Sequence, residues 1–198
     1  MPSPVGHVLG GVAAAWIADL VPGPRAWRTA PAGASWSARA GGGLTAACAA
    51  LAMAPDLDLL IRTHRAVTHS TAAVALAGLL GAALAARARW PVARVSLMCA
   101  VAYATHLLFD WMAVDRYAPN GIQALWPFSS AFYLSGWNIF RQTERARLLT
   151  VASIQTNVLA LAQEMAILAP IVVSVWLVRV KTLAGLSAQL ARGDHPPE

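Results

Sequence analysis

The stretch at residues 148–178 constrains this chain more than any other feature. It lies between Arg147 and Arg179, it is mostly apolar, and its only ionisable residue is Glu164. About 20 consecutive apolar residues in a helix are enough to cross the hydrocarbon core of a bilayer, roughly 30 Å thick. The sequence therefore predicts a membrane-spanning helix here.

Four further apolar stretches accompany this one. Residues 95–114 and 71–86 are also expected to span the membrane, whereas residues 8–20 and 44–54 could be short spans or half-buried helices. Alanine and glycine are abundant in all five stretches, which suits close packing between helices in lipid. We expect an all-α fold: a multi-pass transmembrane helical bundle of about five membrane-embedded helices, three of them full spans and two of them short.

The composition supports this class of protein. Only 12% of the residues are charged, about half the share in ordinary soluble proteins. The length of 198 residues allows a single membrane-embedded helical domain at 1–186, and we expect residues 187–198 to form a disordered C-terminal tail. The formal charge of +6 favours an anionic membrane surface over nucleic acid, because no basic run is interleaved with aromatic residues.

The remaining segments give weaker signals. The start of the chain carries no Lys or Arg, so we do not expect a signal peptide. Cys48 and Cys99 lie in apolar runs without CxxC spacing and are expected to be inert, buried thiols. The connections are residues 21–43, 56–70 and 115–147, and the last is long enough that we expect short interfacial helices within it. Trp111, Trp126 and Trp137 are expected to anchor the protein at the interface.

Basic residues predict an orientation, because Lys and Arg collect on the cytoplasmic side of membrane proteins. If all five stretches cross, nine of the 15 basic residues fall on one side and six on the other. The nine are Arg25, Arg28, Arg39, Arg87, Arg89, Arg94, Arg179, Lys181 and Arg192. We expect this side to be cytoplasmic, in a prokaryotic plasma (inner) membrane, with residues 56–70 outside.

Seven potential metal ligands fall on the extracytoplasmic edge in this topology. They lie at the starts or ends of different apolar stretches: His7, Asp56, Asp58, His64, His69, His106 and Asp110. His106 and Asp110 are four residues apart and would project from one face of a helix. Imidazole and carboxylate groups together suit a divalent metal, and an ionisable group inside an apolar span is usually functional.

Other interpretations of single residues remain open. Asp56 and Asp58 would point about 200° apart on an ideal helix, so both reach one site only if the helix unwinds, or one of them supports the other's site. Asp56 could instead be a helix cap, as Thr68 and Ser70 could be for the helix that follows them.

Three charged residues near these ligands each allow more than one role. Glu164 requires a metal, an arginine or a proton as its partner, and it could form a structural ion pair with Arg62 or Arg65. Arg62 and Arg65 could grip an anionic substrate oxygen or contact a lipid headgroup.

Taken in order, five motifs resemble the membrane-bound metal-dependent hydrolase family of bacteria and archaea, known as the DUF457 or YdjM-like family. The match covers roughly residues 5–130, with Glu164 as a possible later element. The motifs are His7 with Gly10-Gly11, Pro55-Asp56-Leu57-Asp58, His64-Arg65-Ala66-Val67-Thr68-His69-Ser70, His106-Leu107-Leu108-Phe109-Asp110 and Leu125-Trp126-Pro127-Phe128-Ser129. The resemblance implies a multi-pass membrane protein with ligand roles for His7, Asp56, Asp58, His69, His106 and Asp110, and a less defined role for His64. One departure is that residues 111–120 lack the Thr that often follows the aspartate.

These observations lead to one main hypothesis and one alternative. The main hypothesis is a divalent-metal hydrolase, with Zn as the expected ion, in which a metal-activated water attacks an ester or phosphoester of a membrane lipid or another interfacial substrate. Arg65 would stabilise the developing charge, and Asp58 or Glu164 would be the general base. The alternative is a non-enzymatic metal-binding membrane protein that transports or senses cations or acts as a scaffold. The oligomeric state is left open.

Overall fold

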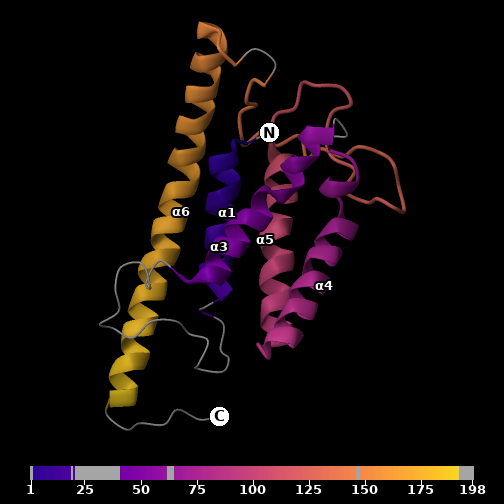
Figure 1. Ribbon diagram of the computed structural model, residues 1–198. Helices are drawn as coiled ribbons and strands as arrows, with labels where there is room; N and C mark the ends of the chain where they lie inside the picture. The colour runs from indigo at the N-terminus through magenta and orange to yellow at the C-terminus, as the bar shows by residue number, and fades with distance from the viewer. Residues whose placement is uncertain (1, 19, 21–40, 62–64, 146–147, 192–198) are drawn as a thin grey trace.

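The structure is a computed structural model that describes residues 2–18, 20, 41–61, 65–145 and 148–191. The described part is helical, with no strand and only two isolated backbone bridges. The elements in order are α1 (Pro4–Ala18), α3 (Gly43–Met53), η2 (Ala54–Ile61), η3 (Val67–His69), α4 (Thr71–Ala88), α5 (Val92–Met112) and α6 (Val151–Ala191) (Figure 1). Helices thus form at all five apolar stretches, and the expected all-α class is confirmed.

Three helices are long and apolar enough to cross a membrane, namely α4, α5 and α6. Helices α1 and α3 have 15 and 11 residues. At a rise of about 1.5 Å per residue, they reach roughly 22 Å and 16 Å, less than the hydrocarbon core of about 30 Å. The division into three spans and two short helices is therefore also confirmed.

Helices α4 and α5 form an antiparallel hairpin. The Ser70 hydroxyl caps α4 by accepting a hydrogen bond from Ala73 N at 3.2 Å, and α4 ends at Arg89 in a left-handed conformation before Pro91. The helices approach closely at Gly81, where an added Cβ would lie 2.8 Å from Cys99 Sγ. Both cysteines are free and buried, as expected. This contact shows why small residues recur on these helices.

Helix α1 lies at the centre of the bundle and contacts α3, α5 and α6. At Gly11 an added Cβ would lie 2.5 Å from the Cys48 carbonyl oxygen on α3, so no larger residue fits there. The short helices are thus held mainly by neighbouring helices, and α1 brings residues from the start of the chain into the bundle.

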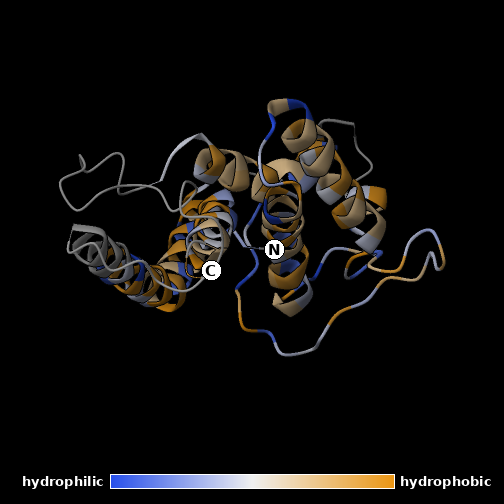
Figure 2. Ribbon diagram, turned by 90° about the horizontal axis from the view of Figure 1, so that it is seen from below, coloured by the Kyte–Doolittle hydropathy of each residue, from blue (hydrophilic) through white to orange (hydrophobic). Residues whose placement is uncertain are grey.

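Helix α6 is the longest element and lies at the side of the bundle (Figure 1). Most of its apolar span is exposed, with only 17% of that window buried. Figure 2 shows that the helices are mainly hydrophobic along their lengths. An apolar helix with so much exposed surface suits lipid as its surroundings. The helix continues through residues 187–191, which the sequence had assigned to the tail.

The connection between α5 and α6 differs from the expectation. No helix forms in its described part, residues 113–145 and 148–150, so the expected short helices are wrong there. Ile122 and Tyr133 instead pair through two backbone hydrogen bonds of 3.1 and 2.9 Å. The Asp115 carboxylate accepts from the backbone N–H groups of Tyr117 and Gly121. Such side-chain bonds to the backbone compete with helix formation.

Several expectations fall on residues outside the described part of the chain. These are Arg62 and His64, nearly all of the connection at 21–43, and residues 192–198 of the tail.

Candidate metal centre

Five predicted ligands meet at one end of the bundle, although they come from four elements. His106 and Asp110 lie on α5, His69 ends η3, Asp56 lies in η2, and His7 lies in the first turns of α1. The three histidines have 0% of their surface exposed, and Asp110 has 3%. A buried group of this kind lies inside the bundle and is not a set of solvated surface charges.

Three side-chain atoms in this group have the spacing of metal ligands. His69 Nε2 lies 3.1 Å from His106 Nε2 and 3.3 Å from Asp110 Oδ2. His106 Nε2 lies 3.4 Å from the same carboxylate oxygen. A tetrahedral zinc ion with bonds of about 2.0–2.1 Å would separate its ligand atoms by roughly 3.3–3.4 Å. Two histidines and one aspartate therefore already have the separation that such an ion requires.

Asp56 offers a fourth ligand atom to the same point. Its Oδ1 lies 3.9 Å from His69 Nε2 and 3.8 Å from His106 Nε2. These distances are slightly longer than the tetrahedral spacing, and the Asp56 side chain is 20% exposed. Asp56 thus occupies the open side of a largely closed group.

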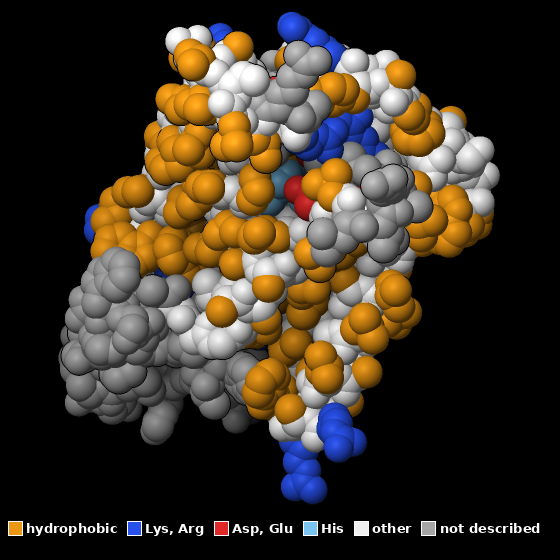
Figure 3. Space-filling view, turned by 45° about the horizontal axis from the view of Figure 1, so that its top comes forward, with side chains coloured by type: hydrophobic (Ala, Val, Ile, Leu, Met, Phe, Trp, Pro, Cys, Tyr) orange, Lys and Arg blue, Asp and Glu red, His pale blue; other side chains and the backbone are white. Residues whose placement is uncertain are grey.

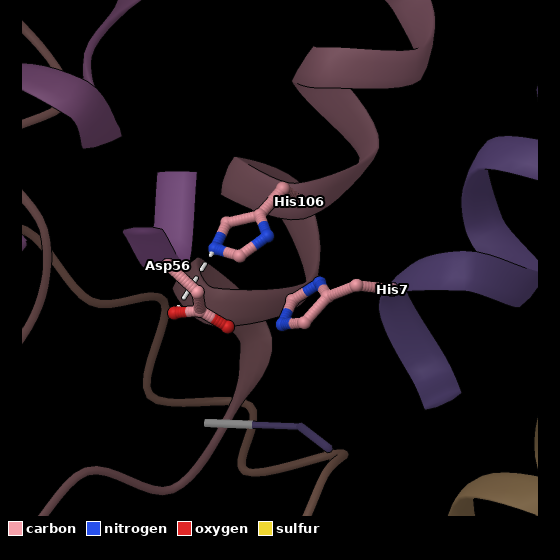
Figure 4. A group of neighbouring side chains, drawn as sticks. All are labelled: His7, Asp56 and His106. Carbon is pink, nitrogen blue, oxygen red and sulfur yellow. Dashed lines mark ion pairs between the residues drawn. The ribbon is translucent and has the colours of Figure 1, made fainter. Parts of the chain in front are cut away.

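His7 stands beside these four residues and stacks on His106. Their ring centroids are 3.7 Å apart with an interplanar angle of 18°. Figure 4 shows both rings together with Asp56, which His7 and His106 approach from α1 and α5. His7 Nε2 also lies 3.5 Å from Asp110 Oδ1, the second oxygen of that carboxylate. Among the residues that the structure describes, two overlapping groups could hold a metal, and they share His106: His69 with His106 and Asp110, and His7 with Asp56 and His106.

The hydrogen bond that His106 makes through Nδ1 leaves its Nε2 atom available to bind a metal. His106 Nδ1 lies 2.7 Å from the Ala52 carbonyl oxygen. A carbonyl can only accept a hydrogen bond, so Nδ1 must carry a proton. In the neutral ring Nε2 then has a free lone pair directed at Asp56 and Asp110, the form in which imidazole binds a metal.

His69 is oriented from its other ring nitrogen. Its Nδ1 lies 3.2 Å from Asp58 Oδ2 and 3.0 Å from the Thr68 hydroxyl. Burial alone would lower the pKa of His69, but hydrogen bonds to Asp110 and Asp58 outweigh that effect and raise it to about 9. Thr68, considered above as a helix cap, therefore belongs to the surroundings of the site.

Buried polar atoms without hydrogen bonds provide a test of whether a metal fits. Among the described residues, both ring nitrogens of His7, Asp56 Oδ1 and both carboxylate oxygens of Asp110 are buried without a hydrogen-bond partner. Buried polar atoms are almost always satisfied, and each exception requires an explanation. A divalent cation satisfies nitrogen and carboxylate oxygen atoms together, so these residues fit a metal.

Asp56 and Asp58 lie on different sides of His69 because the chain leaves α3 through the 3-10 helix η2. Asp58 Oδ2 accepts hydrogen bonds from Arg65 N at 3.0 Å and from the Thr68 hydroxyl at 2.5 Å. It therefore lies on the Nδ1 side of His69, whereas Asp56 lies on the Nε2 side. A carboxylate behind a histidine ligand is a common arrangement at metal sites, where it fixes the ring.

Glu164 belongs to α6, and its carboxylate reaches the start of α1, outside both candidate metal groups. Its carboxylate accepts hydrogen bonds from Ser3 N, at 2.7 Å, and from the Ser3 hydroxyl. An added Cβ at Gly6 would lie 2.7 Å from Glu164 Oε2, so the glycine permits this approach. Glu164 thus connects α6 to the turn that carries His7.

Arg65 is buried and pairs with Asp115, and its Nη1 also donates to the Tyr117 carbonyl oxygen at 3.3 Å. Neither Arg65 nor Asp115 belongs to the candidate metal groups in the described part of the chain. No sequence pattern singled out Asp115, because it lies outside the apolar stretches. Arg62 and His64 lie outside the described residues.

Sequence reasoning missed Arg145, which had been counted only as one of the basic residues that set orientation. It lines a pocket of about 340 Å³ that also contains Asp56. Figure 3 shows histidine and acidic atoms between hydrophobic side chains and beside basic ones, within a mostly hydrophobic face. The candidate metal centre therefore has an opening, and Asp56 belongs to both.

The comparisons with known proteins give a family but no characterised relative. No curated protein and no solved structure matches the chain. The family model for the YdjM inner membrane protein matches residues 1–186, which include every residue of the candidate metal centre. With its three membrane-spanning helices and this match, the chain is an integral membrane protein that belongs to the YdjM inner membrane protein family.

Proposed function

We propose that this protein is a divalent-metal-dependent hydrolase that cleaves an ester or phosphoester at the membrane interface. The observation that carries the proposal is the spacing of His69 Nε2, His106 Nε2 and Asp110 Oδ2, at 3.1 to 3.4 Å from one another. A bound ion would supply Lewis-acid chemistry, activating a water molecule and stabilising developing negative charge on the ester. The nitrogen and oxygen donors suit Zn best.

The residues divide into ligands and supporting groups. His69, His106 and Asp110 are the proposed ligands, and Asp56 is the ligand on the open side. His7 contacts Asp110 through its second oxygen and is the further donor of the centre. Asp58 orients His69, and Glu164 holds the start of α1; their hydrogen bonds support positioning roles more than the general-base role considered from the sequence.

The opening of the site favours an enzyme over the alternatives. A catalytic metal site must be reachable by water and substrate, whereas a structural site is closed. Asp56 is 20% exposed and lines a pocket beside the centre. Cation transport would require polar groups through the full membrane depth. The clustered acids and histidines instead gather at one end of the bundle.

The substrate is expected to come from the membrane, since the centre lies at one end of the membrane-spanning helices, where lipid headgroups are found. The experiment is a hydrolysis screen of phospholipids and soluble phosphoesters with purified protein and added Zn²⁺. The wild type is compared with Asp110→Ala and with Asn120→Ala, an exposed residue in the connection between α5 and α6.

The proposal expects metal-dependent product release from the wild type and Asn120→Ala. Release from Asp110→Ala should be at least about a hundredfold slower, because losing even a partner behind a metal ligand costs about 10- to 100-fold. Equal rates in wild type and Asp110→Ala would contradict it. So would a wild type that holds metal but hydrolyses none of these substrates.

A further inference from the structure

The guanidinium of Arg145 lies in the pocket beside the metal centre without a full set of partners. Its Nη1 atom is buried and has no hydrogen-bond partner among the described residues. The guanidinium lies over the Tyr117 ring, with Cζ 5.3 Å from the ring centroid. Burial, and then the charge of Arg65, lower the pKa of Arg145. A buried arginine donor with no acceptor is costly, and an anionic ligand would satisfy it.

Hydrogen bonds hold the backbone of Arg145 in place. Glu144 N donates to Asn157 Oδ1 at 2.7 Å, and Asn157 Nδ2 donates to the Glu144 carbonyl oxygen at 3.0 Å, so this segment is bound to α6. The Glu144 carboxylate also lines the pocket, but it accepts from the Tyr117 hydroxyl at 2.7 Å and from Arg145 N at 2.9 Å. These bonds occupy the carboxylate and fix the position of the arginine beside it.

The other walls of the pocket are largely apolar. They include Val5 from α1, Leu59 from η2, Leu161 from α6 and Leu148 just before α6. Leu148 is 58% exposed and Val5 45%, so the apolar wall continues onto the outer surface of the molecule. A pocket of about 340 Å³ lies within the usual range for small-molecule sites, roughly 300–1,000 Å³. One polar end and an apolar wall that reaches the surface suit an amphipathic ligand.

From these observations we infer that Arg145 is the phosphate-binding residue of this pocket, and that its ligand is the phosphate group of a membrane lipid. The inference rests on the proposed function and specifies its substrate class. The phosphate would lie between Arg145 and the metal centre at Asp56, and the glycerol and acyl part would lie along Leu148 and Leu161. Arginine suits this role because its planar guanidinium binds phosphate oxygens in pairs.

Binding of two probes to zinc-loaded protein in detergent tests the inference without requiring turnover. The probes are dihexanoyl phosphatidic acid and inorganic phosphate, measured by isothermal titration calorimetry. The variants are Arg145→Gln, Leu148→Ser and the control Arg141→Gln, whose residue is exposed in the same connection. Zinc content and thermal unfolding are recorded for each variant, because Arg145→Gln is expected to keep both.

The inference expects Arg145→Gln to bind both probes about 10- to 100-fold more weakly, the range of a hydrogen bond to a charged group. Leu148→Ser should weaken binding of the phosphatidic acid alone, and Arg141→Gln should change neither. Unchanged binding by Arg145→Gln would overturn the role of Arg145. Equal affinity of the wild type for both probes would overturn the assignment of a lipid as the ligand and leave free phosphate in its place.

Failure of the proposed function gives a different result. A wild type that takes up no zinc would contradict the metal centre. A wild type that holds zinc and shows Arg145-dependent phosphate binding, but no hydrolysis, would retain the binding site and reject the enzyme. Loss of zinc or folding in Arg145→Gln would also overturn the inference, because it would place Arg145 in the framework of the site.

Discussion

The Nε2 atoms of His69 and His106 lie 3.1 Å apart, although 37 residues separate them in the chain. His69 precedes α4 and His106 lies near the end of α5, so the antiparallel hairpin of these helices brings the two rings together. Asp110 contacts both rings with a single carboxylate oxygen. Three ligand atoms are thus organised by one hairpin, while η2 adds Asp56 and α1 adds His7.

Asp58 is predicted to tune the centre without binding the metal. Asp58→Asn removes the charge behind His69 but keeps the size of the side chain, so zinc should bind about 10- to 100-fold more weakly, as at other sites that lose such a partner. The measurement is zinc competition against a chromogenic chelator, with Asn120→Ala as the control. Complete loss of zinc would instead indicate that Asp58 is a ligand, and unchanged affinity would remove it from the site.

Zinc binding is predicted to release a proton from His69. The pKa of this imidazole is raised to about 9 without metal, so the ring is protonated at neutral pH and must lose the proton to bind through Nε2. Apparent affinity should therefore rise with pH by about tenfold per unit between pH 7 and pH 9 for one displaced proton. Titrations across this range check the slope. An affinity that levels off above pH 7 would mean that His69 is already neutral there.

Glu164 is predicted to stabilise the fold and not to take part in metal binding. Glu164→Ala removes both hydrogen bonds to Ser3, and hydrogen bonds to charged groups contribute about 1.5–3 kcal/mol each. The variant should unfold at a lower temperature yet hold wild-type zinc when saturated. Glu164→Gln, which retains an acceptor, should have an unfolding temperature between those of the wild type and Glu164→Ala. Loss of zinc in Glu164→Gln would assign Glu164 to the metal centre.

The orientation predicted from the basic residues can be tested by cysteine labelling. Cysteines introduced at Ala88, at the end of α4, and at Gln123, near the metal centre, lie at opposite ends of the α4–α5 hairpin. The native cysteines are buried and provide a low background. In intact cells an impermeant maleimide should label position 123 and spare position 88. The reverse pattern would place the centre on the cytoplasmic side.

Local spacing predicted the relative placement of two of these residues. His106 and Asp110 lie four residues apart on a helix, and this spacing alone places them on one face, as the 3.4 Å contact confirms. The apolar stretches predicted the helices for a similar reason, since length and composition suffice to specify a span. The edge at which the ligands meet was predicted because successive apolar stretches were expected to cross the membrane in alternating directions.

Other parts of the site depend on tertiary contacts that the sequence does not reveal. The separate roles of Asp56 and Asp58 depend on η2, where the chain leaves the α-helical path of α3. The position of Arg145 depends on the two hydrogen bonds between Glu144 and Asn157. These bonds join two segments that no sequence pattern relates to each other. The irregular connection after α5 is held by Asp115, which pairs with Arg65. A composition rich in turn-forming residues could have indicated that this connection lacks helices.

The most direct test of the metal centre is the zinc content of purified protein measured by plasma mass spectrometry. Asp110→Asn keeps the size of the side chain but removes the charge of the carboxylate that contacts His69 and His106. The account predicts at least one zinc per wild-type chain after dialysis against zinc-containing buffer, and less than about a tenth of that in Asp110→Asn. Equal zinc in both proteins, or none in the wild type, would contradict it.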